Sequence, residues 1–252
     1  MISLTEMERF LAETLQVASI ADYTPNGVQI RGREGVRRVV GGVSACMDLF
    51  RAADEAAADL ILVHHGMFWN KDSRVVQGNL KTRLSFLLER DLTLMAYHLP
   101  LDKHPEYGNN AMILKKLNLK STAPFGSYHG SHLSSIGERE QDETIEGFVA
   151  QVREIFGGEP LVLPFGPEWI RRVAVCSGAA PELVREAKDA GADLFLTGEP
   201  SEPIYHFARE EGIHVIAAGH HRTEKFGVQA IGGLLERQFG VEFQFIDIPN
   251  PI

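Results

Sequence analysis

The spacing of apolar residues shifts along the chain between the helical period and the extended period. Apolar side chains within residues 4–17 recur at helical spacing and predict an amphipathic helix, with Thr5 and Glu8 as candidate capping residues. A Pro-Asn-Gly turn at residues 25–27 leads into an extended stretch. A second helical pattern covers residues 144–156. The chain therefore mixes helices and strands throughout.

An internal repeat organises much of this pattern. Residues 36–66 and 170–200, aligned without gaps at an offset of 134, agree at 12 of 31 positions. Each copy contains an apolar strand, a turn of small residues, a helix rich in Ala, Glu and Arg, and a second apolar strand that begins with Ala-Asp-Leu. This order is a βαβ pattern, which predicts parallel strands joined by right-handed crossovers.

The repeat continues weakly beyond these segments. Residues 91–98 match residues 212–220, and each stretch ends in a histidine, so His98 is expected at the position of His220. We predict an α/β fold in which two intertwined βαβ-containing repeats share one core. The chain is then a single unit, residues 1–252, composed of a first repeat at 1–120, a less regular connection at 121–169 and a second repeat at 170–252.

Composition narrows the choice of partner and compartment. The formal net charge of −9, without long blocks of Lys or Arg, disfavours broad attachment to nucleic acid or to an anionic membrane. Cys46 and Cys176 lack the spacing of a thiolate metal site and are predicted to be reduced core thiols. No apolar run reaches the roughly 18 residues of a membrane span, and the first residues do not resemble a signal peptide. A cytoplasmic location is expected.

Histidines and carboxylates follow the predicted strands, where ligands gather in α/β sheets. Two histidines end one apolar strand, an aspartate lies four residues after His98, and a histidine after another strand has a glutamate at i+4, on the same helical face. These candidate ligands are His64, His65, Asp102, His220 and Glu224. Further candidates for contacts behind the ligands or with substrate are His98, Glu199, His206 and Asn26.

A single histidine is more often an ordinary hydrogen-bonded residue than a ligand, but this combination at equivalent strand ends favours metal. Three imidazoles and two carboxylates suit Zn, Mn, Fe or Ni, and a carboxylate can bridge two ions. Two divalent cations are therefore the predicted cofactors. The chain lacks the sequence motifs of dinucleotide binding, of a P-loop and of a serine-hydrolase elbow. No side chain is singled out as a catalytic residue.

Six segments along the chain resemble the Nif-three-like family, which is also named for GTP cyclohydrolase 1 type 2 homologs. They are DYTPNGVQI, LILVHHGMFW, YHLPLDKHPEYGNN, LFLTGEPSE, AAGHHRTEKFG and FIDIPNP. The similarity covers nearly the whole chain and is greatest to short bacterial members without an inserted middle domain. It implies two intertwined α/β repeats, a dinuclear metal centre and a ring of six subunits whose metal sites face an internal cavity. Carried over by motif, its ligands are the same five residues.

The resemblance also implies a reaction. The predicted function is metal-dependent hydrolysis of a nucleotide or a related small purine compound, with an association to the handling of damaged nucleotides and DNA damage. The alternative is a metal-binding or metal-delivery protein without chemistry, or an oligomeric interaction scaffold. Direct DNA binding is disfavoured by the net charge.

Overall fold

Asp59 and Asp193 occupy matching places in two parallel strand pairs of the computed structural model, which describes residues 1–252. Asp59 Oδ2 accepts hydrogen bonds of 2.8 and 3.0 Å from the backbone N–H groups of residues 37–38. Asp193 Oδ2 accepts equivalent bonds of 3.0 and 2.8 Å from residues 171–172. Both carboxylates thus hold the start of a neighbouring strand. The predicted repeat is confirmed down to individual hydrogen bonds.

The chain forms two compact units. Unit 1 contains residues 1–101 and 227–249, and unit 2 contains residues 102–226 and 250–252. The boundaries predicted for the two repeats and their connection stay predictions, because units are defined by contacts and repeats by internal similarity.

A five-stranded sheet in the order β13-β4-β5-β6-β2 forms the centre of unit 1. Strands β13, β4, β5 and β6 are parallel, and β2 pairs with β6 in the antiparallel direction. The strand bounds are β2 (Gly27–Ile30), β4 (Arg38–Ser44), β5 (Leu60–His65), β6 (Thr93–Ala96) and β13 (Glu242–Phe245). A small antiparallel pair joins β1 (Ile2–Ser3) to β3 (Gly35–Val36). The predicted parallel βαβ unit is present, but the chain bends at residues 23–24, before the predicted turn at 25–27, and Gly27 is already the first residue of β2.

Helices cover both faces of this sheet. Helices α2 (Met47–Glu55) and α3 (Gly78–Glu89) pack their apolar residues against alternate residues of β4, β5 and β6. A Cβ at Gly41 of β4 would lie 3.0 Å from Val228 of α10 (Lys225–Phe239), so α10 packs closely on the other face. Helix α1 (Leu4–Thr14) touches α10 through Phe10 and Phe239, and the short η1 (Val17–Ser19) follows it.

Unit 2 has a six-stranded sheet in the order β7-β8-β10-β11-β12-β9. Strands β10, β11 and β12 are parallel, and the hairpin β7–β8 and the edge strand β9 are antiparallel to their neighbours. The strand bounds are β7 (Lys120–Tyr128), β8 (Ser131–Glu143), β9 (Leu161–Pro164), β10 (Ile170–Cys176), β11 (Leu194–Thr197) and β12 (His214–Ala217). The less regular connection predicted at residues 121–169 thus contains most of β7 and all of β8 and β9.

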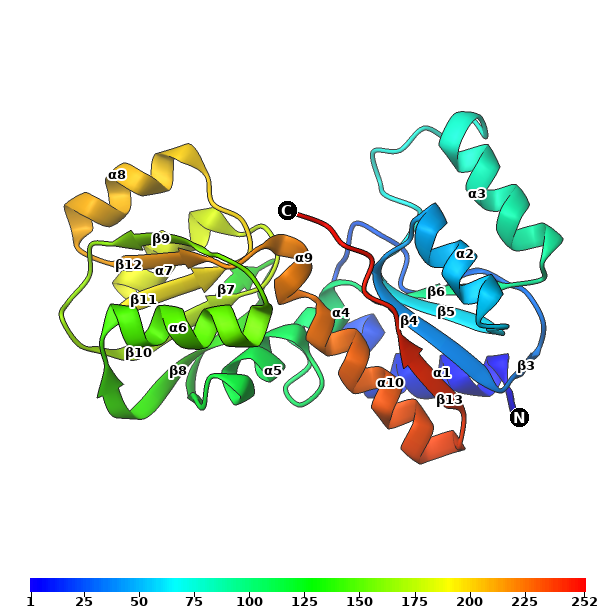
Figure 1. The fold of residues 1–252 in the computed structure, drawn as a ribbon, viewed down its shortest axis with the longest axis horizontal. Helices are drawn as coiled ribbons and strands as arrows, with labels where there is room; N and C mark the ends of the chain where they lie inside the picture. The colour runs from blue at the N-terminus through cyan, green and yellow to red at the C-terminus, as the bar shows by residue number, and fades with distance from the viewer. The chain divides into compact units, whose positions relative to one another are not determined.

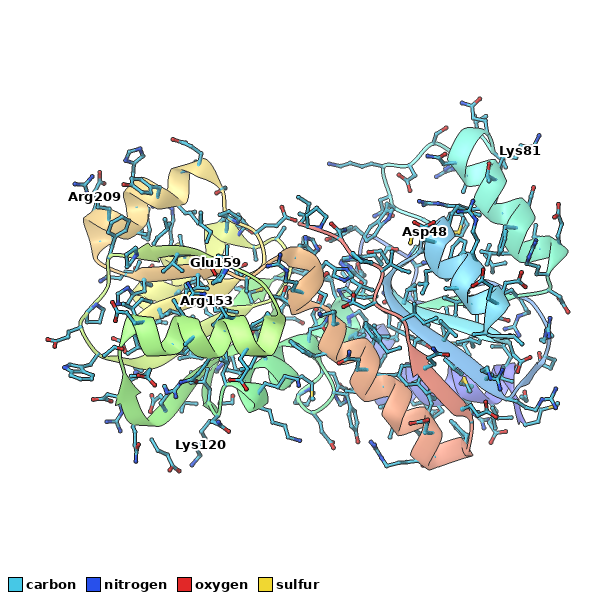
Figure 2. All side chains as sticks on the ribbon, in the orientation of Figure 1. Asp48, Lys81, Lys120, Arg153, Glu159 and Arg209 are labelled. Atoms are coloured by element: carbon cyan, nitrogen blue, oxygen red, sulfur yellow. The ribbon has the colours of Figure 1, made fainter.

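Two separate apolar clusters lie on opposite faces of this second sheet. Helices α5 (Asn109–Lys116) and α6 (Ile145–Phe156) cover one face, and α7 (Val184–Asp189) and α8 (Glu202–Glu211) cover the other, as Figure 1 shows for α6 and α8. The short helices are α4 (Leu99–Lys103), η2 (Pro181–Leu183) and α9 (His220–Thr223). Arg153 in the last turn of α6 forms a surface ion pair with Glu159, at 2.5 Å (Figure 2). None of the helices combines the length and apolar character that crossing a membrane requires.

Local predictions are confirmed for one helix and corrected for another. Helix α6 begins after Thr144, whose side chain accepts a hydrogen bond from Gly147 N, within the predicted range. Helix α1 ends at Thr14, and its cap is Ser3 instead of Thr5. Glu8 does not close a capping box, because its carboxylate accepts the backbone N–H of Val28 at 3.0 Å. The Glu8 carboxylate therefore bonds a residue far away in sequence instead of the N-terminus of its own helix. Neither cysteine is in a disulfide, and burial raises the pKa of the Cys176 thiol.

The expected equivalence of His98 and His220 is wrong by one residue. Tyr97 N donates to Val63 O, and Ala218 N donates to Thr197 O, at matching positions of the two ladders. His98 therefore corresponds to Gly219. The error arose because matching the histidines required an extra residue in one copy, whereas the ladder hydrogen bonds determine the true register.

Replacing Asp193 with alanine should destabilise the protein by about 2–4 kcal/mol, because two strand-end N–H groups lose their acceptor. Chemical denaturation of the wild type and the Asp193→Ala form measures this change. The Asp193→Asn form keeps one carbonyl oxygen and should lose less than half as much. Equal stability of the alanine form and the wild type would show that the matching carboxylates do not hold the strands.

Candidate metal centre

His64 is fully buried at the end of β5, and one of its ring nitrogens is hydrogen-bonded to the backbone. Its Nδ1 lies 2.9 Å from the carbonyl oxygen of Tyr97. Because a carbonyl can only accept, Nδ1 must carry the proton. The lone pair is then on Nε2. A backbone carbonyl that holds the far nitrogen of a histidine is a common support for a metal ligand.

His65 is the last residue of β5, so the two histidines end the apolar strand as predicted. Its Nδ1 is 3.1 Å from Ser44 Oγ of the neighbouring strand β4. Gly66 directly follows the strand. A Cβ there would come within 2.3 Å of the Gln29 amide, whose oxygen accepts Met67 N, so the glycine permits a close approach of Gln29.

His98 follows β6 and is held by a carboxylate far away in sequence. Its Nδ1 is 2.9 Å from Asp22 Oδ1, and both side chains are almost fully buried. Burial opposes ionisation of Asp22, but hydrogen bonds and charge from His98, together with donors on Asn26 and Leu99, lower the pKa of the carboxyl. An ionised Asp22 keeps the proton on His98 Nδ1. As in His64, the lone pair is left on Nε2.

The three imidazoles form one cluster in unit 1. His64, His65 and His98 each offer a ligand atom, and these atoms all lie within 4.8 Å of one another. The ring centroid of His64 is 4.7 Å from that of His65 and 5.0 Å from that of His98. The oxygens that face Nδ1 of His64 and His98 are acceptors, so Nε2 is the donor atom of these two rings, whereas the Ser44 hydroxyl at His65 can donate or accept. This arrangement is near enough and chemically suited to bind a divalent ion.

In unit 2, His220 lies between two glutamates. Its Nε2 is 3.0 Å from Glu224 Oε2, and its Nδ1 forms a very short contact with Glu199. Helix α9 begins at His220, and Glu224 directly follows it, so the predicted i+4 pair does share one face. Burial alone would lower the pKa of His220, but hydrogen bonds and charge from Glu224 and then Glu199 outweigh it and raise this pKa to about 9.

Asp102 is a buried carboxylate supported through one of its oxygens. Asn109 Nδ2 donates to Asp102 Oδ1 at 2.9 Å, and Ser177 Oγ donates to the same atom at 3.1 Å. Both bonds thus use Oδ1. Neutral donors that orient a buried carboxylate in this way are a common support for a metal ligand.

The structure also shows the contacts of the three other candidates, Asn26, His206 and Glu199. Asn26 donates to Asp22 Oδ2 and accepts His98 N at 2.7 Å, so its amide holds the His98 segment. His206 is exposed on α8, where its ring lies against Tyr205. Glu199, at the repeat position of His65, contacts His220.

Sequence reasoning missed three supporting side chains, namely Asp22, Ser44 and Ser177. Ser44 and Ser177 lie at the carboxyl ends of β4 and β10, where the repeat already indicated a site, so their strand-end position was a usable signal. Asp22 had only a weak signal. It precedes the Pro-Asn-Gly turn, and its distance of 76 residues from His98 hides the pairing.

In metal-free protein, the His220 imidazole should titrate near pH 9, well above its ordinary value of about 6.5. The raised pKa means that protonated His220 stabilises the fold fully below pH 6.5 and that this contribution is lost as the pH rises through 9. NMR titration of the ring protons measures the value directly. Removing one acid in Glu199→Gln should shift it downward, and an unchanged value would contradict the role given to Glu199.

The chain is similar to known proteins over nearly its whole length. The model of the family Duf34/NIF3 (NGG1p interacting factor 3) matches residues 2–251. A Pseudomonas aeruginosa protein named GTP cyclohydrolase 1 type 2 homolog is 44% identical over 250 residues, covering 99% of both chains. An Archaeoglobus fulgidus protein of the same name is 42% identical over 249 residues, covering 99% of both.

Solved structures agree with the sequence comparison. The solved structure of protein ybgI, a structural genomics protein of unknown function, has a TM-score of 0.95 at 39% identity, and the match covers 100% of both chains. The resemblance inferred from the six segments is therefore confirmed, and so is the predicted α/β fold. The chain belongs to the Duf34/NIF3 family.

Proposed function

We propose that the chain binds two divalent metal ions through His64, His65, Asp102, His220 and Glu224 and hydrolyses a nucleotide or a related small purine compound. The observation that carries the proposal is the support of two neighbouring buried ligands, His64 and His65, whose Nδ1 atoms each lie within hydrogen-bond distance of an oxygen. Such support orients neutral imidazole toward a metal. The name GTP cyclohydrolase 1 type 2 homolog, borne by relatives, supports the choice of a purine compound.

Bound ions of this kind lower the pKa of coordinated water and polarise a substrate. The protein's own side chains have separate tasks. Tyr97 O and Ser44 orient His64 and His65. Asp22 holds His98 in the tautomer with a lone pair on Nε2, where it can accept a proton or a hydrogen bond from substrate. Glu199 orients His220 from the opposite side of the ring.

A ring of six subunits is part of the same proposal and follows from the resemblance alone. Light scattering of the purified protein measures the mass directly. A monomer or dimer at micromolar concentration would contradict the ring without affecting the proposed ligands.

The function is tested by metal analysis combined with a substrate screen. Wild type and His65→Ala are purified, loaded in turn with Zn, Mn, Fe or Ni, and assayed against nucleotides, cyclic amides and phosphoesters. We expect about two ions per wild-type chain, fewer in His65→Ala, and activity at least about 100-fold lower in the variant. The exposed His132 supplies a matched control, His132→Ala, which should behave as wild type.

Two results would overturn parts of this proposal. If metal-loaded wild type turns over nothing and His65→Ala behaves identically, the hydrolase is wrong. If the wild type holds metal but exchanges it rapidly with a chelator and shows no turnover, the metal-delivery alternative is favoured, because a catalytic site retains its ions.

A further inference from the structure

A pocket of about 330 Å³ lies in unit 2 beside Asp102. Its walls come from the end of α4, from α5 and from the hairpin β7–β8, and its lining includes Lys103, Lys115, Ser121 and Ser135. The volume is at the lower end of the range for small-molecule sites, about 300–1,000 Å³. It suits a compound the size of a mononucleotide and is too small for a polymer.

The charged groups around this pocket are mostly basic. Lys103, Lys115 and His104 line it, whereas Asp102 is its only acid. Lys103 Nζ lies 3.3 Å from the hydroxyl of Ser131, and neither lysine forms an ion pair with a carboxylate. Asp102 already accepts two hydrogen bonds from neutral donors. The pocket therefore presents uncompensated positive charge, which attracts an anion.

The floor of the pocket adds hydroxyl donors and an apolar surface. Ser121 pairs with Gly137 across the hairpin, so the two residues share one face of the sheet. A Cβ at Gly137 would lie 2.7 Å from Leu114 and Leu119, which places this face toward α5. Ser135, two residues before Gly137, faces the same way. The pocket lining thus combines hydroxyls and lysines with an apolar part to which leucines contribute.

We propose that this pocket binds a small phosphorylated compound, with Lys103 and Lys115 contacting its phosphate and the leucines contacting its apolar body. Lysine ammonium groups and serine hydroxyls are ordinary donors to phosphate oxygens. Because Asp102 lines the pocket, the bound compound lies next to one of the proposed ligands. This inference rests on the proposed function and narrows its substrate to a phosphate monoester.

Binding of GMP, guanosine and inorganic phosphate, measured by isothermal titration calorimetry, tests the proposal. Each probe is titrated into metal-loaded and metal-stripped full-length protein, so that binding to metal and binding to lysine are separated. The variants are Lys103→Gln and Lys115→Gln. Lys120→Gln is the matched control, because Lys120 is exposed on β7 outside the pocket (Figure 2). Thermal melting checks that all three variants fold.

We expect GMP to bind at least about 10-fold more tightly than either guanosine or inorganic phosphate. Each pocket variant should weaken GMP binding by about 5- to 10-fold and leave guanosine binding unchanged, with Lys120→Gln as wild type. The lysine dependence should persist without metal. Equal affinity for GMP and guanosine, equal affinity for GMP and free phosphate, or no effect of either pocket lysine would overturn the proposal.

The outcomes separate this inference from the proposed function. Lysine-dependent GMP binding without turnover would refute only the hydrolase. Turnover of a purine compound that does not depend on Lys103 or Lys115 would refute only the pocket.

Discussion

Replacing Gly178 with alanine should remove metal binding from unit 2 although no donor atom is lost. A Cβ at this position would lie 2.4 Å from Glu224 Oε1 and 3.4 Å from His220 Nε2. The methyl group must displace the carboxylate, which is buried and has little room to move. We expect at least about a 100-fold loss of metal affinity, corresponding to roughly 3 kcal/mol, measured by metal content and by competition with a chelator.

Gly178 also has a positive φ of +67°, which strains any other residue, so the control must carry the same strain. Gly157 has a φ of +72° and open space where a Cβ would be. The Gly157→Ala form should lose about 1 kcal/mol of stability but keep its metal. Full metal content in Gly178→Ala would show that Glu224 is not a ligand in the observed position.

Replacing Asn110 with alanine should destabilise the protein by about 3–5 kcal/mol. Asn110 is 2% exposed, and its amide donates to the carbonyl oxygens of Asp102 and Leu133 and accepts the N–H of Ser177 at 2.8 Å. The substitution leaves these backbone groups buried without their partner. Urea denaturation measures the change in the free energy of unfolding.

The exposed Asn70 provides a control for this substitution, since Asn70→Ala should change stability by less than about 0.5 kcal/mol. A cost below about 1 kcal/mol in Asn110→Ala would mean that water replaces the lost amide. Because Asn110 connects α5 to β8 and β10, the variant should also bind metal less tightly through Asp102.

The succession of strand, helix and strand in each βαβ unit could be predicted because both copies of the repeat show the same pattern. Two aspartates in equivalent Ala-Asp-Leu segments were visible as repeated letters, and the structure shows that each holds the start of a neighbouring strand. The antiparallel hairpin β7–β8 was less apparent. Its strands have no copy in the other half, and several of their side chains are exposed on both faces, which weakens the alternation of apolar residues.

The candidate ligands could be chosen from the sequence for two reasons. The end of an apolar run indicates the end of a strand, and an i+4 spacing implies a shared helical face. His220 and Glu224 are the clearest example, with 3.0 Å between Nε2 and Oε2. The supporting groups were harder to find. Nothing near His98 in sequence indicates Asp22, and the register error that paired His98 with His220 shows the limit of matching single residues.

The residue types of the candidate site, their strand-end positions and the family could be inferred from the sequence, because local spacing and whole-chain similarity encode them. Which nitrogen His64 and His98 offer became clear from the folded structure. Carbonyl, hydroxyl and carboxylate groups from distant segments hold the Nδ1 atoms of His64, His65 and His98. A tautomer depends on a hydrogen-bond partner, and that partner becomes a neighbour only when the chain folds.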